Sequence, residues 1–345
     1  ASTKEQKVYL TRAGNAIETY RLLHTITASA RPVRTLTWNA DGSLLISGSF
    51  DSYIKIWSID NWSCLGSISS QQDLILNVCF HRNKNILVSS GSDGSIRLWN
   101  ISTGELLKHI QGHSDWVNGL ACSQTSSLMI SGGDDQMVKF WDSQTGHCQK
   151  TLQGTASKSM GLSLSPDGKI LVASTSSSHL HCWNLETDNQ PQVLNEHSMW
   201  VAALEISPDG QTIASGGLDK TIVLWDIHTC RPTRVLRKHT HAVRAIAWSP
   251  DSQVLAAASE DAMLCLWNAT TGECQHVLND HQDRVWTIAW SPDGTVLATG
   301  SSDRTIRLWN PQTGRLLTTQ PVAETIFSLA WSADGSRLFS GRQQR

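Results

Sequence analysis

The sequence predicts an all-β protein built from copies of one four-stranded unit, and three observations support this fold class. The pattern Asp-x-x-[Ile/Val/Leu]-x-x-Trp returns every 42 residues, and a fixed period of this size indicates a repeat array. Short runs rich in β-branched and aromatic residues alternate with Gly, Asp, Ser and Asn turns. No segment has a helical period, so helices should be nearly absent. The periodic tryptophans are Trp57, Trp99, Trp141, Trp183, Trp225, Trp267 and Trp309.

The third copy shows how the unit is divided into strands. Its strands are expected at Glu105–Ile110, Trp116–Cys122, Leu128–Ser131 and Met137–Trp141. The hairpin that follows the second of these strands reads Ser-Pro-Asp-Gly in three other copies, in which Pro and Asp favour the turn and Gly accepts the positive φ. These hairpins are Ser165–Gly168, Ser207–Gly210 and Ser291–Gly294.

The two ends of the chain are expected to complete one shared unit. After the last periodic Trp, Thr325–Gly341 repeats the hairpin portion, which therefore occurs eight times. The missing strands are at the other terminus, where Val8–Leu10 matches the third strand and Glu18–Leu23 matches the outer strand. In this alignment Thr11 stands where the eighth Trp would be. Residues 1–345 would then form a single closed domain without exposed sheet edges.

The motifs together resemble a known family. The dipeptide Gly112-His113, the Ser-Pro-Asp-Gly hairpin, the Asp turn and the strand-end Trp resemble the WD-repeat β-propellers, in particular the WD-repeat regions of bacterial and cyanobacterial proteins. The resemblance covers the whole chain. It implies an eight-bladed β-propeller of four-stranded antiparallel blades, in which two N-terminal strands complete the C-terminal blade. A seven-bladed ring is the alternative, and it would leave the C-terminal hairpin without a partner.

The resemblance also assigns the repeated His and Asp residues a structural role. In three copies the spacing matches the hydrogen-bonded tetrad Asp–His–Ser/Thr–Trp of that family, which fits a fully paired buried network and not a hydrolytic triad. The sixth copy has Ala257 in place of the hydroxyl, and the fourth has Ser177 in place of the turn Asp. The three tetrads are Asp135–His113–Ser131–Trp141, Asp219–His197–Ser215–Trp225 and Asp303–His281–Thr299–Trp309.

Composition argues against several functional classes. The net charge of −2 provides no basic surface for nucleic acid, and no apolar run approaches the length of a membrane span. The eight cysteines lack metal-ligand spacing, so buried reduced thiols in a cytoplasmic protein are expected. The inner-strand positions offer no catalytic chemistry. We therefore expect no enzymatic activity, no metal and no cofactor. Those positions hold Asn118, Met160, Ala202, Trp286 and Phe327.

The repeat locates candidate binding residues on one rim of the ring. Propellers of this family bind through positions that flank the inner strand, namely the residue three after the His and the residue just before the turn Asp. Large apolar side chains at such positions are typical of interaction hot spots. The apolar candidates are Trp116, Trp200, Phe50, Leu74 and Leu218. The basic candidates are Arg34, Arg244 and Arg284, and the acidic ones are Asp115 and Asp134.

These features predict a non-enzymatic scaffold that binds a protein or peptide partner on the top rim. The alternative is a sensor or regulatory propeller within a larger signalling protein that carries an NTPase or kinase module. A phosphopeptide or small-ligand binder is a further possibility, since arginines can hold a carboxylate or a phosphate. We expect a cytoplasmic monomer that binds neither nucleic acid nor membrane. The sequence does not identify the partner.

Overall fold

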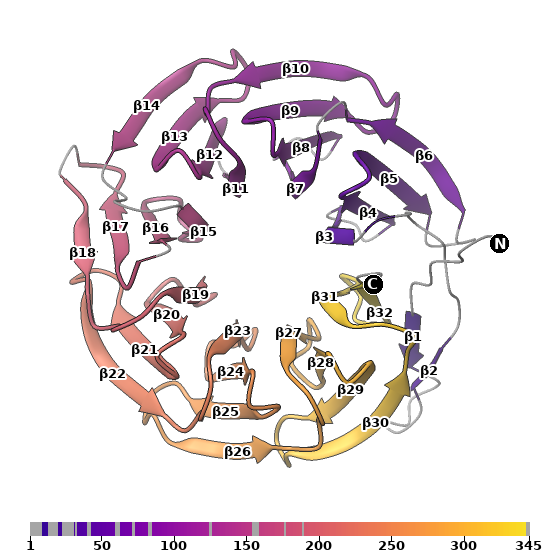
Figure 1. The fold of residues 1–345 in the computed structure, drawn as a ribbon, viewed down its shortest axis with the longest axis vertical. Coiled ribbons are helices and arrows are strands. Elements are labelled where there is room, and N and C mark those ends of the chain that lie inside the picture. The colour runs from indigo at the N-terminus through magenta and orange to yellow at the C-terminus, as the bar shows by residue number, and fades with distance from the viewer. Residues whose placement is uncertain are drawn as a thin grey trace.

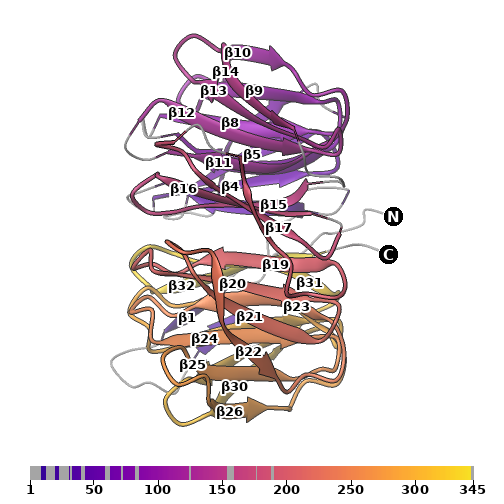
Figure 2. The ribbon, with the colours of Figure 1, turned by 90° about the vertical axis from the view of Figure 1, so that its left-hand side faces the viewer.

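The fold is built entirely from β-strands in the part of the chain that the structure describes. The computed structural model describes residues 9–12, 20–22, 31, 33–39, 43–58, 63–70, 73–81, 85–123, 126–153, 159–175, 177–187 and 190–342. These residues form eight four-stranded antiparallel sheets, here called blades 1 to 8. Figure 1 shows them arranged in a ring, with the strands of each blade following one another from the centre outwards, and Figure 2 shows the ring from the side.

Blades 1 to 4 each use four consecutive strands. Blade 1 contains β3 (Val33–Trp38), β4 (Leu44–Ser49), β5 (Tyr53–Ser58) and β6 (Cys64–Ser69). Blade 2 contains β7 (Ile75–Phe80), β8 (Ile86–Gly91), β9 (Ser95–Asn100) and β10 (Leu106–Gln111). Blade 3 contains β11 (Val117–Cys122), β12 (Leu128–Gly133), β13 (Met137–Asp142) and β14 (Cys148–Gln153). Blade 4 contains β15 (Ser159–Leu164), β16 (Ile170–Thr175), β17 (Leu180–Asn184) and β18 (Gln192–Leu194).

The second half of the ring continues in the same way up to blade 8. Blade 5 contains β19 (Val201–Ile206), β20 (Thr212–Gly217), β21 (Thr221–Asp226) and β22 (Arg231–Arg237). Blade 6 contains β23 (Val243–Trp248), β24 (Val254–Ser259), β25 (Leu264–Asn268) and β26 (Cys274–Leu278). Blade 7 contains β27 (Val285–Trp290), β28 (Leu297–Ser301), β29 (Thr305–Asn310) and β30 (Arg315–Pro321). Blade 8 contains β31 (Ile326–Trp331), β32 (Arg337–Arg342), β1 (Tyr9–Arg12) and β2 (Tyr20–Leu22).

Blade 8 joins the two ends of the chain. Its strand order is β2-β1-β32-β31, so two N-terminal strands pair with two C-terminal strands, as the eight-bladed interpretation requires. The backbone register corrects one detail of the sequence alignment. Leu10 pairs with Leu338 in the way that Trp309 pairs with Leu297, so Leu10 and not Thr11 takes the place of the eighth Trp. Short strands with alternating side chains allow a one-residue error of this kind in a sequence alignment.

The hydrophobic core lies between neighbouring blades. One cluster of buried side chains joins Leu180 of blade 4 to Val201 and Trp225 of blade 5. The same kind of packing closes the ring, because the rings of Trp38 in blade 1 and Phe339 in blade 8 are 4.5 Å apart in an edge-on arrangement. Each blade therefore depends on its neighbours for burial of its apolar faces, as expected for a repeat protein.

Candidate functional site

The three predicted tetrads are present as buried hydrogen-bond chains. In blade 3, Nδ1 of His113 is 2.9 Å from Asp135, and Nε2 is 2.7 Å from Oγ of Ser131. The indole N–H of Trp141 donates to the same hydroxyl over 2.8 Å. Equivalent chains link the predicted residues of blades 5 and 7.

The proton arrangement in blade 3 favours a neutral imidazole. Burial lowers the pKa of His113, although hydrogen bonding to Asp135 opposes this shift. A neutral ring can donate from Nδ1 to Asp135 and accept the hydroxyl proton of Ser131 at Nε2. The hydroxyl then accepts from Trp141, so every polar atom of the chain is paired. The imidazole of His113 and the hydroxyl of Ser131 are 3% and 0% exposed, so the tetrad has the burial and pairing of a structural network.

The rim pairs predicted from the repeat are also neighbours in space. The backbone N–H just before the turn Asp donates to the carbonyl three residues after the His position. The hydrogen bond runs from Asp134 to Trp116 and from Leu218 to Trp200, each over 2.8 Å. Equivalent bonds join Ser92 to Leu74, Glu260 to Ala242 and Ser302 to Arg284. The inner-strand entry and the Asp turn of a blade therefore form one unit of the rim.

The apolar candidates differ in how far they reach solvent. Trp116 is 43% exposed, which is unusual for an indole in a repeat array. Trp200, Phe50, Leu74 and Leu218 are half-buried. These five residues are spread over blades 1, 2, 3 and 5.

Blades 5, 6 and 7 bring arginine and tryptophan side chains together. The guanidinium of Arg244 lies 6.0 Å from the ring centre of Trp200 and 5.6 Å from that of Trp286. Its Nε donates to Oε1 of Glu260 over 2.6 Å. Arg284 lies further out, with its Nε 3.8 Å from Oε2 of Glu260 and its side chain 53% exposed. We call these five residues the arginine–tryptophan sector.

The charged candidates outside this sector are held by local hydrogen bonds. Asp134 accepts a hydrogen bond of 2.6 Å from the side-chain amide of Asn118. Asp115 is exposed and accepts the backbone N–H of Trp116. Arg34 is exposed on blade 1, whereas Arg244 and Arg284 belong to blades 6 and 7. Two of the basic candidates thus share an acidic neighbour, because Glu260 pairs with both Arg244 and Arg284.

Two residues of this rim were missed by the sequence analysis. Trp286 was treated as an inner-strand residue without chemistry, yet it stacks on Arg244, donates to Oγ of Ser302 over 2.7 Å and contacts Phe327. Met199 precedes Trp200 and is 51% exposed. Its position matches that of Asp115 one residue before Trp116. The repeat alignment could have identified Met199, because it places this apolar residue directly before a rim tryptophan.

The cysteines depart from the expectation of separate buried thiols. All eight are free, but Cys64 and Cys148 are exposed, and only Cys182 and Cys265 are fully buried. Three pairs are close enough to hydrogen-bond through sulfur, namely Cys79–Cys122, Cys182–Cys230 and Cys265–Cys274. Sequence spacing could not show this, because two of the pairs join different blades. Among the described residues no group of three or more His, Cys, Asp or Glu side chains is placed to hold a metal ion.

The described residues include no helix that is long and apolar enough to cross a membrane. A closed ring of four-stranded antiparallel blades, with His–Asp–hydroxyl–Trp chains in blades 3, 5 and 7, defines the chain as a repeat β-propeller. The chain belongs to the WD40 family, described as WD domain, G-beta repeat. The family model matches seven repeats, at residues 20–58, 62–100, 104–142, 146–184, 189–226, 230–268 and 272–310. The four strands outside these matches are β30, β31, β32 and β1, which are split between the chain ends.

Two known proteins and one solved structure are similar to this chain. It is 41% identical to the COMPASS component SWD3 of Saccharomyces cerevisiae over 59 residues, which cover 17% of this chain and 19% of that protein. It is 35% identical to the periodic tryptophan protein 2 homolog of Schizosaccharomyces pombe over 66 residues, which cover 19% of this chain and 8% of that protein. These matches span less than a fifth of either relative. The crystal structure of the computationally designed Ika8 protein superposes with a TM-score of 0.79 at 25% identity, covering 92% of this chain and 97% of that one.

Proposed function

We propose that this propeller is a non-enzymatic interaction module that binds a protein or peptide partner through the rim containing the arginine–tryptophan sector and Trp116. The observation that carries the proposal is the exposure of Trp116 and Arg284 at equivalent rim positions, and of Met199 directly before the rim residue Trp200. Tryptophan and arginine contribute most to binding energy at interfaces. The name of one relative describes a component of COMPASS, which supports a role within an assembly.

The chemistry of the sector favours a partner with both aromatic or aliphatic and acidic groups. The exposed guanidinium of Arg284 can take a carboxylate in a bidentate pair. Trp116 and Met199 offer apolar surface on either side of blade 4. Because Glu260 already neutralises part of the arginine charge, a multiply charged phosphopeptide or nucleic acid is a poorer fit than a peptide of mixed character.

A selection of displayed peptides on the immobilised full chain tests the proposal. Selected peptides are labelled, and their affinities are compared by fluorescence polarisation for the wild type, Trp116→Ala and Arg284→Ala. We expect each substitution to weaken binding about tenfold or more, which corresponds to about 1.4 kcal/mol. Leu107→Ala is the matched control, because Leu107 is 46% exposed on the outer strand β10 and should leave the affinity unchanged. Equal affinity for all four proteins would contradict the proposal.

The alternative proposal is that the propeller is the sensor or docking part of a larger signalling protein of bacterial type, with an NTPase or kinase module. The short matches to the yeast relatives are compatible with different surroundings for the same repeats. We further propose that the isolated chain is monomeric and cytoplasmic. Light scattering after size-exclusion chromatography tests the first point, and fractionation of cells that express the full-length gene tests the second.

A further inference from the structure

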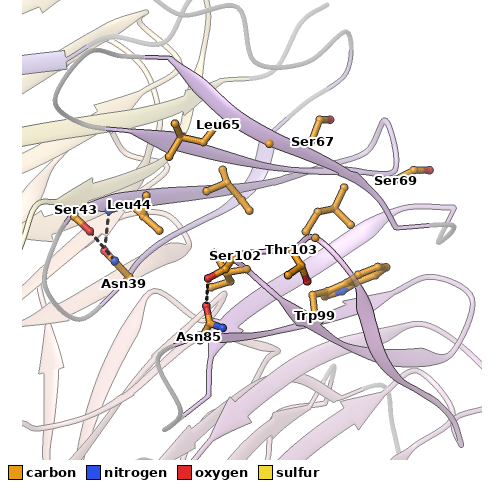
Figure 3. A pocket seen from close by; sticks show the side chains of 15 residues that line it. Asn39, Ser43, Leu44, Leu65, Ser67, Ser69, Asn85, Trp99, Ser102 and Thr103 are labelled. Atoms are coloured by element: carbon orange, nitrogen blue, oxygen red, sulfur yellow. Dashed lines mark hydrogen bonds between the residues drawn. The ribbon is translucent and has the colours of Figure 1, made fainter.

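Three pockets occupy the same place in the repeat, at the seam between consecutive blades. The first lies between blades 1 and 2, has a volume of about 730 Å³ and is lined by Leu44, Leu65 and Trp99, among others (Figure 3). The second lies between blades 6 and 7, with about 690 Å³. The third lies between blades 4 and 5 and holds only about 160 Å³. The equivalent lining residues Leu44, Ile170 and Val254 show that these are copies of one site.

The smallest pocket differs from the others by two cysteines. Where the seam of blades 1 and 2 has Ile56, the seam of blades 4 and 5 has Cys182. Where the former has Gly104, the latter has Cys230. The six other copies of the Cys182 position are Ile56, Leu98, Phe140, Leu224, Leu266 and Leu308. Two positions, one in blade 4 and one in blade 5, therefore differ from the equivalent residues of the blade 1–2 seam, and both carry a cysteine at the same seam.

Cys230 also keeps a backbone conformation that the repeat provides with glycine. The equivalent residues Gly104, Gly146, Gly272 and Gly314 have φ between +68° and +80°, and Cys230 has φ +51°. A left-handed conformation is unfavourable for a residue with a Cβ atom. The thiol is therefore held at a position where a side chain carries a conformational cost.

The two sulfur atoms are 2.7 Å apart, and one thiol hydrogen-bonds to the other. A disulfide bond is about 2.05 Å long, so the atoms need to approach by only roughly 0.7 Å to be bonded. Both cysteines line the pocket, but Cys182 on β17 is 3% exposed, whereas Cys230, which precedes β22, is partly exposed. A small reagent can thus reach Cys230 first and leave Cys182 as the second thiol.

We propose that Cys182 and Cys230 form an oxidative modification site, at which a small peroxide converts the pair into a disulfide that joins blades 4 and 5. The thiolate of Cys230 attacks one peroxide oxygen, the O–O bond breaks, and a sulfenic acid and hydroxide form. The thiol of Cys182 then attacks the sulfenic sulfur, and water leaves as the S–S bond forms. In total two thiols and one hydrogen peroxide give one disulfide and two waters, so the peroxide is the two-electron oxidant.

The local environment supports this order of steps. Hydrogen bonding with Cys182 lowers the pKa of the Cys230 thiol, and the same contact together with burial raises the pKa of Cys182. Since the thiolate is the nucleophile, Cys230 is the group that reacts with the oxidant. The pocket volume of about 160 Å³ is also larger than a peroxide needs, given that one water takes roughly 30 Å³.

Peptide mapping of the full chain tests the proposal. Reduced protein is treated with a small excess of hydrogen peroxide, alkylated under denaturing conditions and digested with trypsin without reduction. Because Lys220 separates the two cysteines, they fall on different tryptic peptides. We expect one cross-linked peptide pair that contains Cys182 and Cys230 and is about 2 Da lighter than the sum of the two reduced peptides. Dithiothreitol should restore both thiols.

Matched variants separate the proposal from general oxidation. Cys230→Gly introduces the glycine that four other repeats have at this position, should fold normally and should lose the cross-link. Cys148→Ser removes an exposed thiol elsewhere and should keep it. The melting temperature of the wild type should rise by a few degrees on oxidation, and that of Cys230→Gly should not. Full alkylation of Cys182 and Cys230 after peroxide, or linkage of Cys182 to a different cysteine, would overturn the proposal.

Discussion

The imidazole Nε2 of His239 and the indole Nε1 of Trp267 are both buried in blade 6 without a hydrogen-bond partner among the described residues. In blades 3, 5 and 7 the equivalent nitrogens share one hydroxyl group, as Ser131 shows in blade 3. In blade 6 that position is Ala257, which is fully buried. The sequence predicted the missing hydroxyl, and the structure shows that nothing replaces it. Two buried polar atoms are consequently unpaired.

Ala257→Ser should therefore stabilise the protein. The new hydroxyl can donate to His239 and accept from Trp267, and each hydrogen bond contributes about 1 kcal/mol. We expect the free energy of unfolding, measured by chemical denaturation, to rise by about 1–2 kcal/mol. Ala256→Ser is the control, because it buries a hydroxyl one residue away, on the other face of the strand, and should be destabilising. The same loss of stability in both variants would show that the gap does not accept a hydroxyl.

The complete tetrads should show the opposite effect. Ser215→Ala removes the hydroxyl that pairs with Trp225 and His197. Two buried polar atoms lose their partner, so the free energy of unfolding should fall by about 1–3 kcal/mol. Ser340→Ala provides a matched control. Ser340 is fully buried at the equivalent position of blade 8, and its Oγ has no hydrogen-bond partner among the described residues. Its removal should leave stability unchanged or raise it, because no hydrogen bond is lost; an equal loss in both variants would contradict the assignment.

Stability should depend on pH through Glu205. Burial raises the pKa of Glu205 to about 7, although its carboxylate accepts the backbone N–H of Trp248 over 3.0 Å. A raised pKa means that the folded state retains a proton that the unfolded chain loses. Stability is therefore full below the unfolded pKa, about 4.3, and decreases as the pH rises towards 7.

Glu205→Gln should remove this dependence. From pH 5 to pH 8 the wild type should lose up to about 3 kcal/mol relative to the variant, measured by urea unfolding across the range. Glu186→Gln is the control, since Glu186 is exposed and pairs with Lys169 at the surface. Its pH profile should run parallel to that of the wild type. Parallel profiles for all three proteins would show that Glu205 titrates normally.

Trp116 and Trp141 should respond differently to truncation, although both are tryptophans of blade 3. Trp116→Ala should change the free energy of unfolding by less than about 1 kcal/mol, because its ring is 43% exposed. Trp141→Ala should cost about 3–5 kcal/mol, because its ring is 3% exposed and packs in the core. Thermal and chemical denaturation measure both. A large loss for Trp116→Ala would identify it as a packing residue and weaken the binding proposal.

Removal of residues 1–22 should disrupt the ring. This truncation deletes β1 and β2 and exposes the edge of β32, whose unpaired backbone groups can pair with other molecules. We expect aggregation or a marked loss of soluble monomer on size-exclusion chromatography. Adding the missing segment in trans as a peptide should partly restore the monomer. A stable monomeric truncation would show that blade 8 is not needed for closure.

The repeat allowed much of the fold and the tetrads to be predicted, because equivalent residues have the same spacing in each copy. The distance along the chain from His113 to Asp135 is the same in every complete copy, so contacts within one blade follow from counting. The register of β1 was misjudged by one residue, because Leu10 and Thr11 belong to a short strand without the periodic Trp. The family model counts seven repeats for the same reason, since the last four strands are divided between the chain ends.

The sequence by itself determined the unit, its strands, its turns and the hydrogen bonds inside a blade. Only the tertiary structure decided which side chains of different blades meet. Arg244 stacks between Trp200 and Trp286, and Cys182 touches Cys230, because the angle between neighbouring blades brings together residues more than 40 positions apart. A linear period carries no information about that angle, which results from how the apolar faces of eight sheets pack around one axis.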